Sequence, residues 1–372
     1  MAQLSDLRVQ KFARILVEHS TQVLPGDRVG ITATTAAEPL IREIYKQVLQ
    51  RGGFPHLLLD FPGQDELLFK YASDTQLDFI PLFHKMAFDE FEVLVKIRSE
   101  VNTRALSGID PARQSRRQKA LASLLQAQMQ RGAEKSLRWM STLYPTNAYA
   151  MEAEMGLEEY QEFVFNAIHA DDATPDPVAY WKRVEENQKR IIDCIQGHDK
   201  VELRGPNVDL SLSIKGRTFR NASGQNNMPD GEIYTGPVED SANGWVRFTY
   251  PAVYLGRVVE GIELHFEAGR VVKAHARKNE KFLGEMLESD TGARYLGEFA
   301  IGTNFEIDRF TKNILFDEKI GGSFHMALGA GYPETGSLNK SVIHWDMICD
   351  LRQDSEIRVD GEAMYRNGQF TF

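Results

Sequence analysis

The sequence is poor in cysteine and has no excess of positive charge. Two cysteines occur among 372 residues, Cys194 and Cys349, so at most one disulfide can form, and their spacing matches no zinc-binding pattern. We therefore exclude a disulfide-stapled scaffold and a structural zinc site made of thiolates. Lysine and arginine total 43 against 53 aspartate and glutamate residues, which gives a formal net charge of −10. This balance argues against nucleic acid as a partner, because such binding needs a strongly basic surface.

The sequence also lacks a long apolar stretch. No window approaches the ~18 apolar residues of a membrane-spanning helix. The first twenty residues carry charges at Asp6, Arg8, Lys11 and Arg14 and contain no apolar segment of the kind found in signal peptides. We therefore expect a cytoplasmic protein that does not interact with membranes.

Hydrophobic residues make up 42% of the chain and charged residues 26%, which is typical of globular proteins. In the first half, short apolar segments alternate with helical patterns. This alternation predicts an α/β domain with a mostly parallel sheet covered by helices. The expected strands are 28–32, 56–61, 90–97 and 137–143, and the expected helices are 4–19, 38–51 and 111–130.

The pattern changes after a long helical stretch at 177–197. From residue 200 onward, short alternating segments are separated by glycine and proline turns, with one helical window at 279–289. These features predict a β-rich α+β domain. We place the boundary near residue 180, so that an N-terminal α/β domain covers 1–180 and a C-terminal domain covers 181–372.

Residues 342–351, VIHWDMICDL, form a predicted strand with two different faces. Residues i and i+2 of a strand project from the same side. One face therefore carries His344 and Asp346, and the other carries the apolar Trp345, Met347 and Cys349, which we expect to pack in the core. A His-x-Asp pair alone is also typical of a half-exposed strand, so the motif needs support from other residues.

Three residues elsewhere supply that support. His325 lies among small residues in GGSFHMALG, and Glu232 follows a Pro-Asp-Gly turn. Glu298 stands between apolar residues, where an unpaired carboxylate is costly and a bound cation would remove the cost. With His344 and Asp346 they form a mixed nitrogen and oxygen ligand set, which suits zinc, manganese, cobalt or iron.

The number of candidate ligands bears on the type of centre. Five ligands exceed the three that a protein usually supplies to one catalytic zinc, and they suit two ions about 3.5–4 Å apart. The alternative is a mononuclear Fe(II) centre in which His325, His344 and Asp346 form a two-His-one-carboxylate triad. Such a centre has no use for both Glu232 and Glu298, so their presence favours two metals.

Four segments in this order, GEIYTGP, YLGEFAIGTN, FDEKIGGSFHMALG and HWDMICDL, resemble the thermophilic metallo-aminopeptidases typified by aminopeptidases T, S and II. The resemblance extends over the whole chain, with weaker N-terminal matches in EVNTRALSGIDPARQ and RWMSTLYPT. It implies a hydrolase with an N-terminal α/β domain, a C-terminal catalytic domain and a homodimer. It also implies two divalent ions (zinc, cobalt, manganese or magnesium) and peptide substrates with a free N-terminus.

The resemblance assigns roles by motif. The five positions that match the metal ligands of the family are Glu232, Glu298, His325, His344 and Asp346. Tyr332 matches a tyrosine thought to assist catalysis, although a turn tyrosine in a Gly-Tyr-Pro loop is an equally good interpretation. Glu318 is our candidate for a proton shuttle or a residue behind the ligands, with a surface salt bridge near Lys319 as the alternative.

Two points stay open at this level. The loop between His325 and His344 is shorter than in some members of the family, so the preference for substrate side chains is not defined. Some ring-cleaving dioxygenases of pyridine catabolism are similar to this family and use the three positions of the mononuclear iron alternative.

Overall fold

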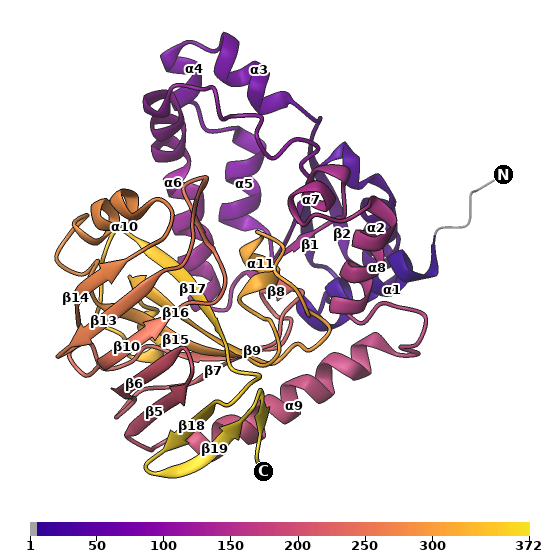
Figure 1. Cartoon of the computed structure of the whole chain (residues 1–372). Helices are drawn as coiled ribbons and strands as arrows, with labels where there is room; N and C mark the ends of the chain where they lie inside the picture. The colour runs from indigo at the N-terminus through magenta and orange to yellow at the C-terminus, as the bar shows by residue number, and fades with distance from the viewer. Residues whose placement is uncertain (1–5) are drawn as a thin grey trace. The chain divides into compact units, whose positions relative to one another are not determined.

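The structure, a computed structural model, describes residues 6–372, which form two compact units (Figure 1). Unit 1 contains the chain up to Lys182 together with the segment Gly224–Pro229, and unit 2 contains Arg183–Ser223 and Asp230–Phe372. The division into domains at 1–180 and 181–372 stays a prediction. Among the described residues, no helix is long and apolar enough to cross a membrane.

Unit 1 is built on a five-stranded sheet in the order β2-β1-β3-β4-β8, in which every pair of neighbours is parallel. The predicted parallel sheet is therefore confirmed. Its strands are β1 (Arg28–Thr34), β2 (Phe54–Asp60), β3 (Val93–Arg98), β4 (Arg138–Leu143) and β8 (Asn227–Met228). The central strands β1 and β3 are mostly buried, as expected for strands covered on both faces.

The start of the longest helix of unit 1 is explained by its sequence. The longest, α6, starts with Pro111 directly after Asp110, whose side chain accepts a hydrogen bond from the Ala112 amide. The helices are α1 (Leu7–Arg14), α2 (Glu38–Gln50), α3 (Gln64–Tyr71), α4 (Asp74–Asp78), α5 (Leu82–Glu90), α6 (Pro111–Ala133), α7 (Asn147–Glu152) and α8 (Leu157–Ala167), and a π-helix at Ile15–Ser20 follows α1. The helix predicted at 4–19 begins outside the described residues, and the rest of it matches α1 and the π-helix.

The long helix α9 (Pro177–Ile195) leads into unit 2, which is rich in antiparallel strands as predicted. An eight-stranded sheet has the order β14-β13-β10-β6-β5-β18-β19-β20. Its strands are β5 (Lys200–Gly205), β6 (Val208–Ser213), β10 (Asn243–Arg247), β13 (Glu263–Glu267), β14 (Arg270–His275), β18 (Glu356–Val359), β19 (Glu362–Arg366) and β20 (Gln369–Phe370).

A second sheet of unit 2 has five strands in the order β17-β16-β15-β9-β7. These are β7 (Arg220–Ala222), β9 (Glu232–Thr235), β15 (Leu296–Gly302), β16 (Ser323–Gly329) and β17 (His344–Asp350). The remaining elements are a hairpin of β11 (Ala252–Tyr254) and β12 (Arg257–Val259), helix α10 (Glu280–Leu287) and the short helix α11 (Ile314–Asp317).

Both sheets of unit 2 contribute one face to a single hydrophobic core. The eight-stranded sheet supplies residues such as Leu203 and Leu210, and the five-stranded sheet supplies Phe324, Met326 and Trp345. Trp345 is 1% exposed, which confirms its predicted place in the core. Because residues alternate between faces, the residues between these core positions point to the opposite side of the five-stranded sheet.

Candidate metal centre

The register of the five-stranded sheet brings the five predicted ligands to one face. Glu232 lies on β9, Glu298 on β15, His325 on β16, and His344 with Asp346 on β17. Directly opposed residues of antiparallel strands share a face, and so do residues two apart. The pairs Glu232–Gly302, Glu298–Ala327, His325–Ala300, Asp346–Ala327 and His344–Gly329 therefore place all five on the side that faces away from the core.

Small residues between these side chains leave room for the cluster. Ile348 opposes His325 from β17, and the other positions that oppose the five candidates on neighbouring strands hold small residues: Ala222, Ala300, Gly302, Ala327 and Gly329. A larger residue at any of these small positions would project among the candidate ligands. These small residues on β7, β15 and β16 thus leave space in which the polar groups meet.

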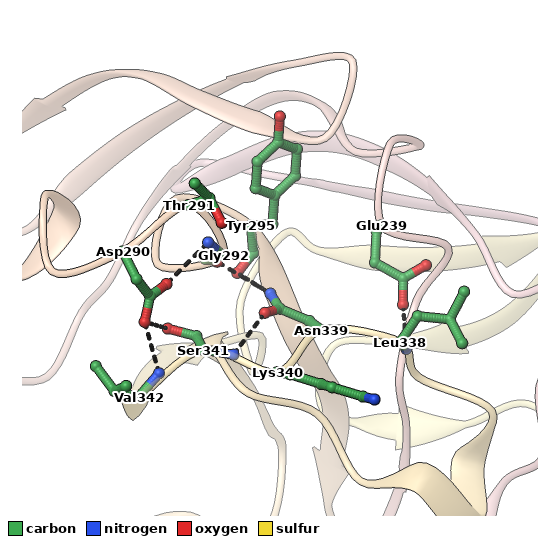
Figure 2. A pocket seen from close by; sticks show the side chains of 10 residues that line it. All are labelled: Glu239, Asp290, Thr291, Gly292, Tyr295, Leu338, Asn339, Lys340, Ser341 and Val342. Atoms are coloured by element: carbon green, nitrogen blue, oxygen red, sulfur yellow. Dashed lines mark hydrogen bonds between the residues drawn. The ribbon is translucent and has the colours of Figure 1, made fainter.

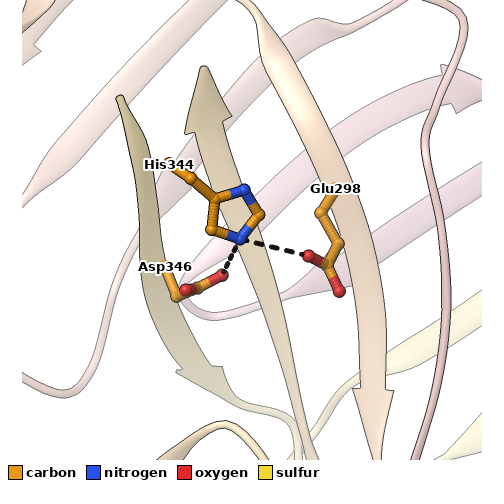
Figure 3. A group of neighbouring side chains, drawn as sticks. All are labelled: Glu298, His344 and Asp346. Carbon is orange, nitrogen blue, oxygen red and sulfur yellow. Dashed lines mark ion pairs between the residues drawn. The ribbon is translucent and has the colours of Figure 1, made fainter. Parts of the chain in front are cut away.

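The imidazole and carboxylate atoms converge at short range. His325 Nε2 lies 3.5 Å from Glu232 Oε2 and 3.6 Å from Glu298 Oε1. His344 Nε2 lies 3.4 Å from Glu298 Oε2 and 3.5 Å from Asp346 Oδ1. Dashed lines mark these two ion pairs in Figure 3. Glu298 therefore contacts both histidines, one through each carboxylate oxygen. Such a position between two nitrogen donors is what a carboxylate shared by two ions requires.

Three observations fit the binding of metal at this cluster. The first is the length of the four separations, which exceed the about 2.7–3.2 Å of N–H···O hydrogen bonds. They are close to the about 3.3–3.4 Å between two ligands of one tetrahedral ion with bonds of about 2.0–2.1 Å. The second is that two buried oxygens, Glu232 Oε2 and Asp346 Oδ1, have no hydrogen-bond partner among the described residues.

The third observation is the tautomer of His344. Its Nδ1–H donates a hydrogen bond of 2.7 Å to the carbonyl oxygen of Ala330, because a carbonyl can only accept. In the neutral imidazole, this bond leaves the lone pair on Nε2, which is the atom that faces the carboxylates. A backbone carbonyl behind the outer nitrogen is the usual partner of a metal-binding histidine.

The charges of the metal-free cluster favour protonated histidines. Burial opposes the charged form, but the contact with Glu298 outweighs it and raises the pKa of His325 to about 9. Burial is likewise outweighed at His344, where Asp346 raises the pKa to about 12. Burial acts against ionisation of Asp346 as well, yet His344 lowers the pKa of this carboxyl to about 2. Metal binding must therefore displace protons from the imidazoles.

Glu318 belongs to the same neighbourhood. Ligand atoms of Glu318, His325 and Asp346 all lie within 4.8 Å of one another, as do those of Glu298, His344 and Asp346. Glu318 also forms an ion pair with Lys319, whose side chain is fully buried. The alternative of a surface salt bridge therefore does not describe this pair, because Lys319 has no exposed surface.

The family of this chain follows from comparison with known sequences. The sequence profile of the thermophilic metalloprotease (M29) family matches residues 5–370, almost the entire chain. The chain belongs to this metalloprotease family. It is therefore a hydrolase that depends on a divalent metal ion, and the alternative of a mononuclear iron dioxygenase receives no support.

Several aminopeptidases are similar in sequence to this metalloprotease chain over almost its whole length. It is 27% identical to aminopeptidase 2 of Geobacillus stearothermophilus, over 99% of this chain and 98% of the relative. It is 26% identical to aminopeptidase T of Thermus thermophilus, over 98% of this chain and 96% of the relative. The solved structure of wild-type AmpT from Thermus thermophilus superimposes with a TM-score of 0.84 at 22% identity, covering 98% and 99% of the two chains. This match confirms the predicted fold class.

Two tyrosines adjoin the cluster in this metalloprotease. The ring of Tyr332 lies 5.4 Å from that of His344 and 5.4 Å from that of Tyr234, measured between ring centres. Burial and the charge of Glu298 raise the pKa of both phenols above the ordinary value, so both keep their proton at neutral pH. The prediction that singled out Tyr332 is consistent with this position, although its role stays a prediction.

Two residues of the site were missed by the sequence analysis. Tyr234 shares the face of Glu232 two positions along β9, a place that the alternation of GEIYTGP could have indicated. Lys319 Nζ lies 3.0 Å from Glu232 Oε1. No pattern in the sequence indicates this contact, because it joins β9 to the loop before β16.

The loop between β16 and β17 lines a pocket of about 610 Å³ (Figure 2). Its lining residues are Glu239, Asp290, Thr291, Gly292, Tyr295, Leu338, Asn339, Lys340, Ser341 and Val342. Asp290 Oδ2 accepts hydrogen bonds from the Ser341 hydroxyl and the Val342 amide, and so holds the end of the loop two residues before His344. The short connection noted in the sequence is therefore anchored next to the candidate centre.

Proposed function

We propose that this protein is a metal-dependent aminopeptidase that releases N-terminal amino acids from peptides with the help of two divalent ions. The observation that carries the proposal is the meeting of five nitrogen and oxygen ligands on one face of a sheet, with Glu298 between the two histidines. The names of the relatives, aminopeptidases of bacteria, support peptides with a free N-terminus as substrates.

The ligands divide naturally between two ions. Glu232 and His325 would hold one ion, His344 and Asp346 the other, and Glu298 would serve both through its two oxygens. When bound, zinc, cobalt, manganese or magnesium would polarise the scissile carbonyl and acidify the attacking water. The net negative charge of the cluster suits ions of this kind, and the nitrogen ligands favour zinc, cobalt or manganese over magnesium.

The residues around the ligands would carry out the remaining tasks. The protonated phenol of Tyr332 would donate a hydrogen bond to the oxyanion that develops on the carbonyl. Glu318 would accept a proton from the attacking water on Oε2, the oxygen that does not contact Lys319, and deliver it to the leaving amine. The short distance between Glu318 and the His325 and Asp346 ligand atoms supports this role.

The test is hydrolysis of leucine p-nitroanilide by protein stripped with a chelator and titrated separately with Co²⁺, Zn²⁺ and Mn²⁺. We expect activity that saturates near two ions per chain and no hydrolysis of N-acetyl-leucine p-nitroanilide, which lacks the free amine. Equal hydrolysis of both compounds would contradict an aminopeptidase. Saturation at one ion would contradict the two-ion centre. The homodimer and the cytoplasmic location expected above stay predictions.

A further inference from the structure

A lysine with no exposed surface lies beside the candidate ligands. Lys319 follows α11 and precedes β16, and its side chain is 0% exposed. Its ammonium group contacts Glu232 Oε1 at 3.0 Å and also contacts Glu318 Oε1. A buried ammonium is stable only when it is paired, so these two carboxylates define its position.

The contact restricts what Glu232 can offer to an ion. Oε1 is occupied by Lys319, whereas Oε2 lies 3.5 Å from His325 Nε2 and has no hydrogen-bond partner among the described residues. Glu232 can therefore bind an ion through Oε2 alone as long as Lys319 holds Oε1. A carboxylate without this partner could turn and bind through both oxygens.

Lys319 also changes the charge of the cluster. Four carboxylates, Glu232, Glu298, Glu318 and Asp346, lie on or beside the site, and Lys319 contacts two of them. Together with the protonated imidazoles, this ammonium group partly neutralises the carboxylates when divalent ions are absent. The same ammonium group repels a divalent ion that binds at Glu232.

We propose that Lys319 is a built-in cation of the centre, which stabilises the metal-free site, holds Glu232 as a one-oxygen ligand and thereby lowers the affinity for divalent ions. The inference rests on the proposed metal centre. It concerns how tightly ions are held rather than which reaction follows. The lysine would keep the centre exchangeable, so that its metal content depends on the supply of ions.

The experiment measures Zn²⁺ affinity by competition with a chromophoric chelator in the metal-free wild type, Lys319→Gln and Lys319→Arg. Lys281→Gln is the matched control, because Lys281 is a 91% exposed lysine on α10 and its replacement makes the same change in charge. A unit charge in contact with a carboxylate ligand acts appreciably on a divalent ion bound at that ligand, even at high dielectric constant. We therefore expect Lys319→Gln to bind Zn²⁺ at least about tenfold more tightly than the wild type.

Lys319→Arg and Lys281→Gln should bind like the wild type. The thermal midpoint gives a second readout. Metal-free Lys319→Gln should have a lower midpoint than the metal-free wild type, and saturating Zn²⁺ should raise its midpoint by more. Unchanged or weaker binding by Lys319→Gln would overturn the inference. A variant that folds only with Zn²⁺ would support it, and a variant that fails to fold even with Zn²⁺ would overturn it. A wild type that binds no Zn²⁺ would instead refute the proposed centre itself.

Discussion

Among single residues, Glu298 has the most connected position, because each of its oxygens contacts a different histidine. Glu298→Gln keeps the size of the side chain and removes the charge that two ions would share. We expect the metal content to fall from two ions per chain to at most one, and hydrolysis to fall at least ~100-fold, since ligands matter more than the residues behind them. Elemental analysis and p-nitroanilide turnover measure both. A Gln variant with two ions and full turnover would show that Glu298 does not join them.

Tyr332 can be tested separately from metal binding. In Tyr332→Phe, the ring next to His344 is retained and the phenol that would donate to the oxyanion is removed. We expect kcat to fall about 100- to 1,000-fold with unchanged metal content and little change in KM. Tyr254→Phe is the control, because Tyr254 stacks on Trp345, which lies on the core face of the five-stranded sheet. If both variants retain wild-type kcat, Tyr332 is a loop residue only.

The sequence places the candidate ligands on a common face more readily than it places the residues around them. His344 and Asp346 could be assigned to one face because the period of a strand is two, and their neighbour Trp345 is buried as that period requires. The contact of Lys319 with Glu232 depends instead on where the loop after α11 lies relative to β9. No local period records such a contact, so it emerges only from the three-dimensional structure.

At the level of elements, the small residues of β15 and β16 are as characteristic of the site as the ligands. Ala327 opposes both Glu298 and Asp346 and is fully buried. Ala327→Leu would push a branched side chain among these carboxylates, with overpacking that costs about 1–3 kcal/mol in stability. We expect Zn²⁺ affinity to fall at least ~100-fold while circular dichroism shows intact strands.

The neighbouring position supplies the control for this substitution. Met326 lies on the core face of the same strand, and Met326→Leu nearly conserves its volume. This variant should bind Zn²⁺ like the wild type. If Ala327→Leu also retained wild-type affinity, the site face would have more room than the register indicates.

Elements of different length were predicted with different success. Helix α6 was expected at 111–130 and runs Pro111–Ala133, because a long helix repeats its pattern many times and has a clear N-cap at Asp110. Three helices between residues 64 and 90 were not predicted, since each has only five to nine residues and too few turns to show a period. The apolar segment at 56–61 is a strand, but it lies at the sheet edge with Leu57 and Leu59 exposed.

At the level of the whole molecule, the two units differ in what the sequence reveals. The pattern changes from alternating helices and strands to short strands near residue 180, the compact units divide after Lys182, and the domain division itself stays a prediction. The return of Gly224–Pro229 to unit 1 could not be foreseen, because β8 pairs with β4 through only two residues, Asn227 and Met228. A pairing so short leaves no pattern in the sequence.

Metal removal should affect the two units unequally, because all five proposed ligands belong to unit 2. Ions that bind the folded state at a concentration of about 1,000 times their Kd stabilise it by about 4 kcal/mol, which corresponds to roughly 10 °C in the melting midpoint of a unit of this size. We expect a chelator to lower the midpoint of unit 2 by about this amount. Hydrogen exchange should become faster in β9, β15, β16 and β17.

The strands of unit 1 act as the internal control in the same sample. Exchange in β1 and β3 should stay within error of the metal-loaded protein, because the burial of these strands involves no proposed ligand. Adding Zn²⁺ back should restore protection in unit 2 alone. Faster exchange spread evenly over both units would mean that the ions stabilise the whole chain rather than the sheet that carries the ligands. Unchanged exchange in both units would mean that the metal has no structural role, because the sheet would then tolerate its buried carboxylates without a divalent ion.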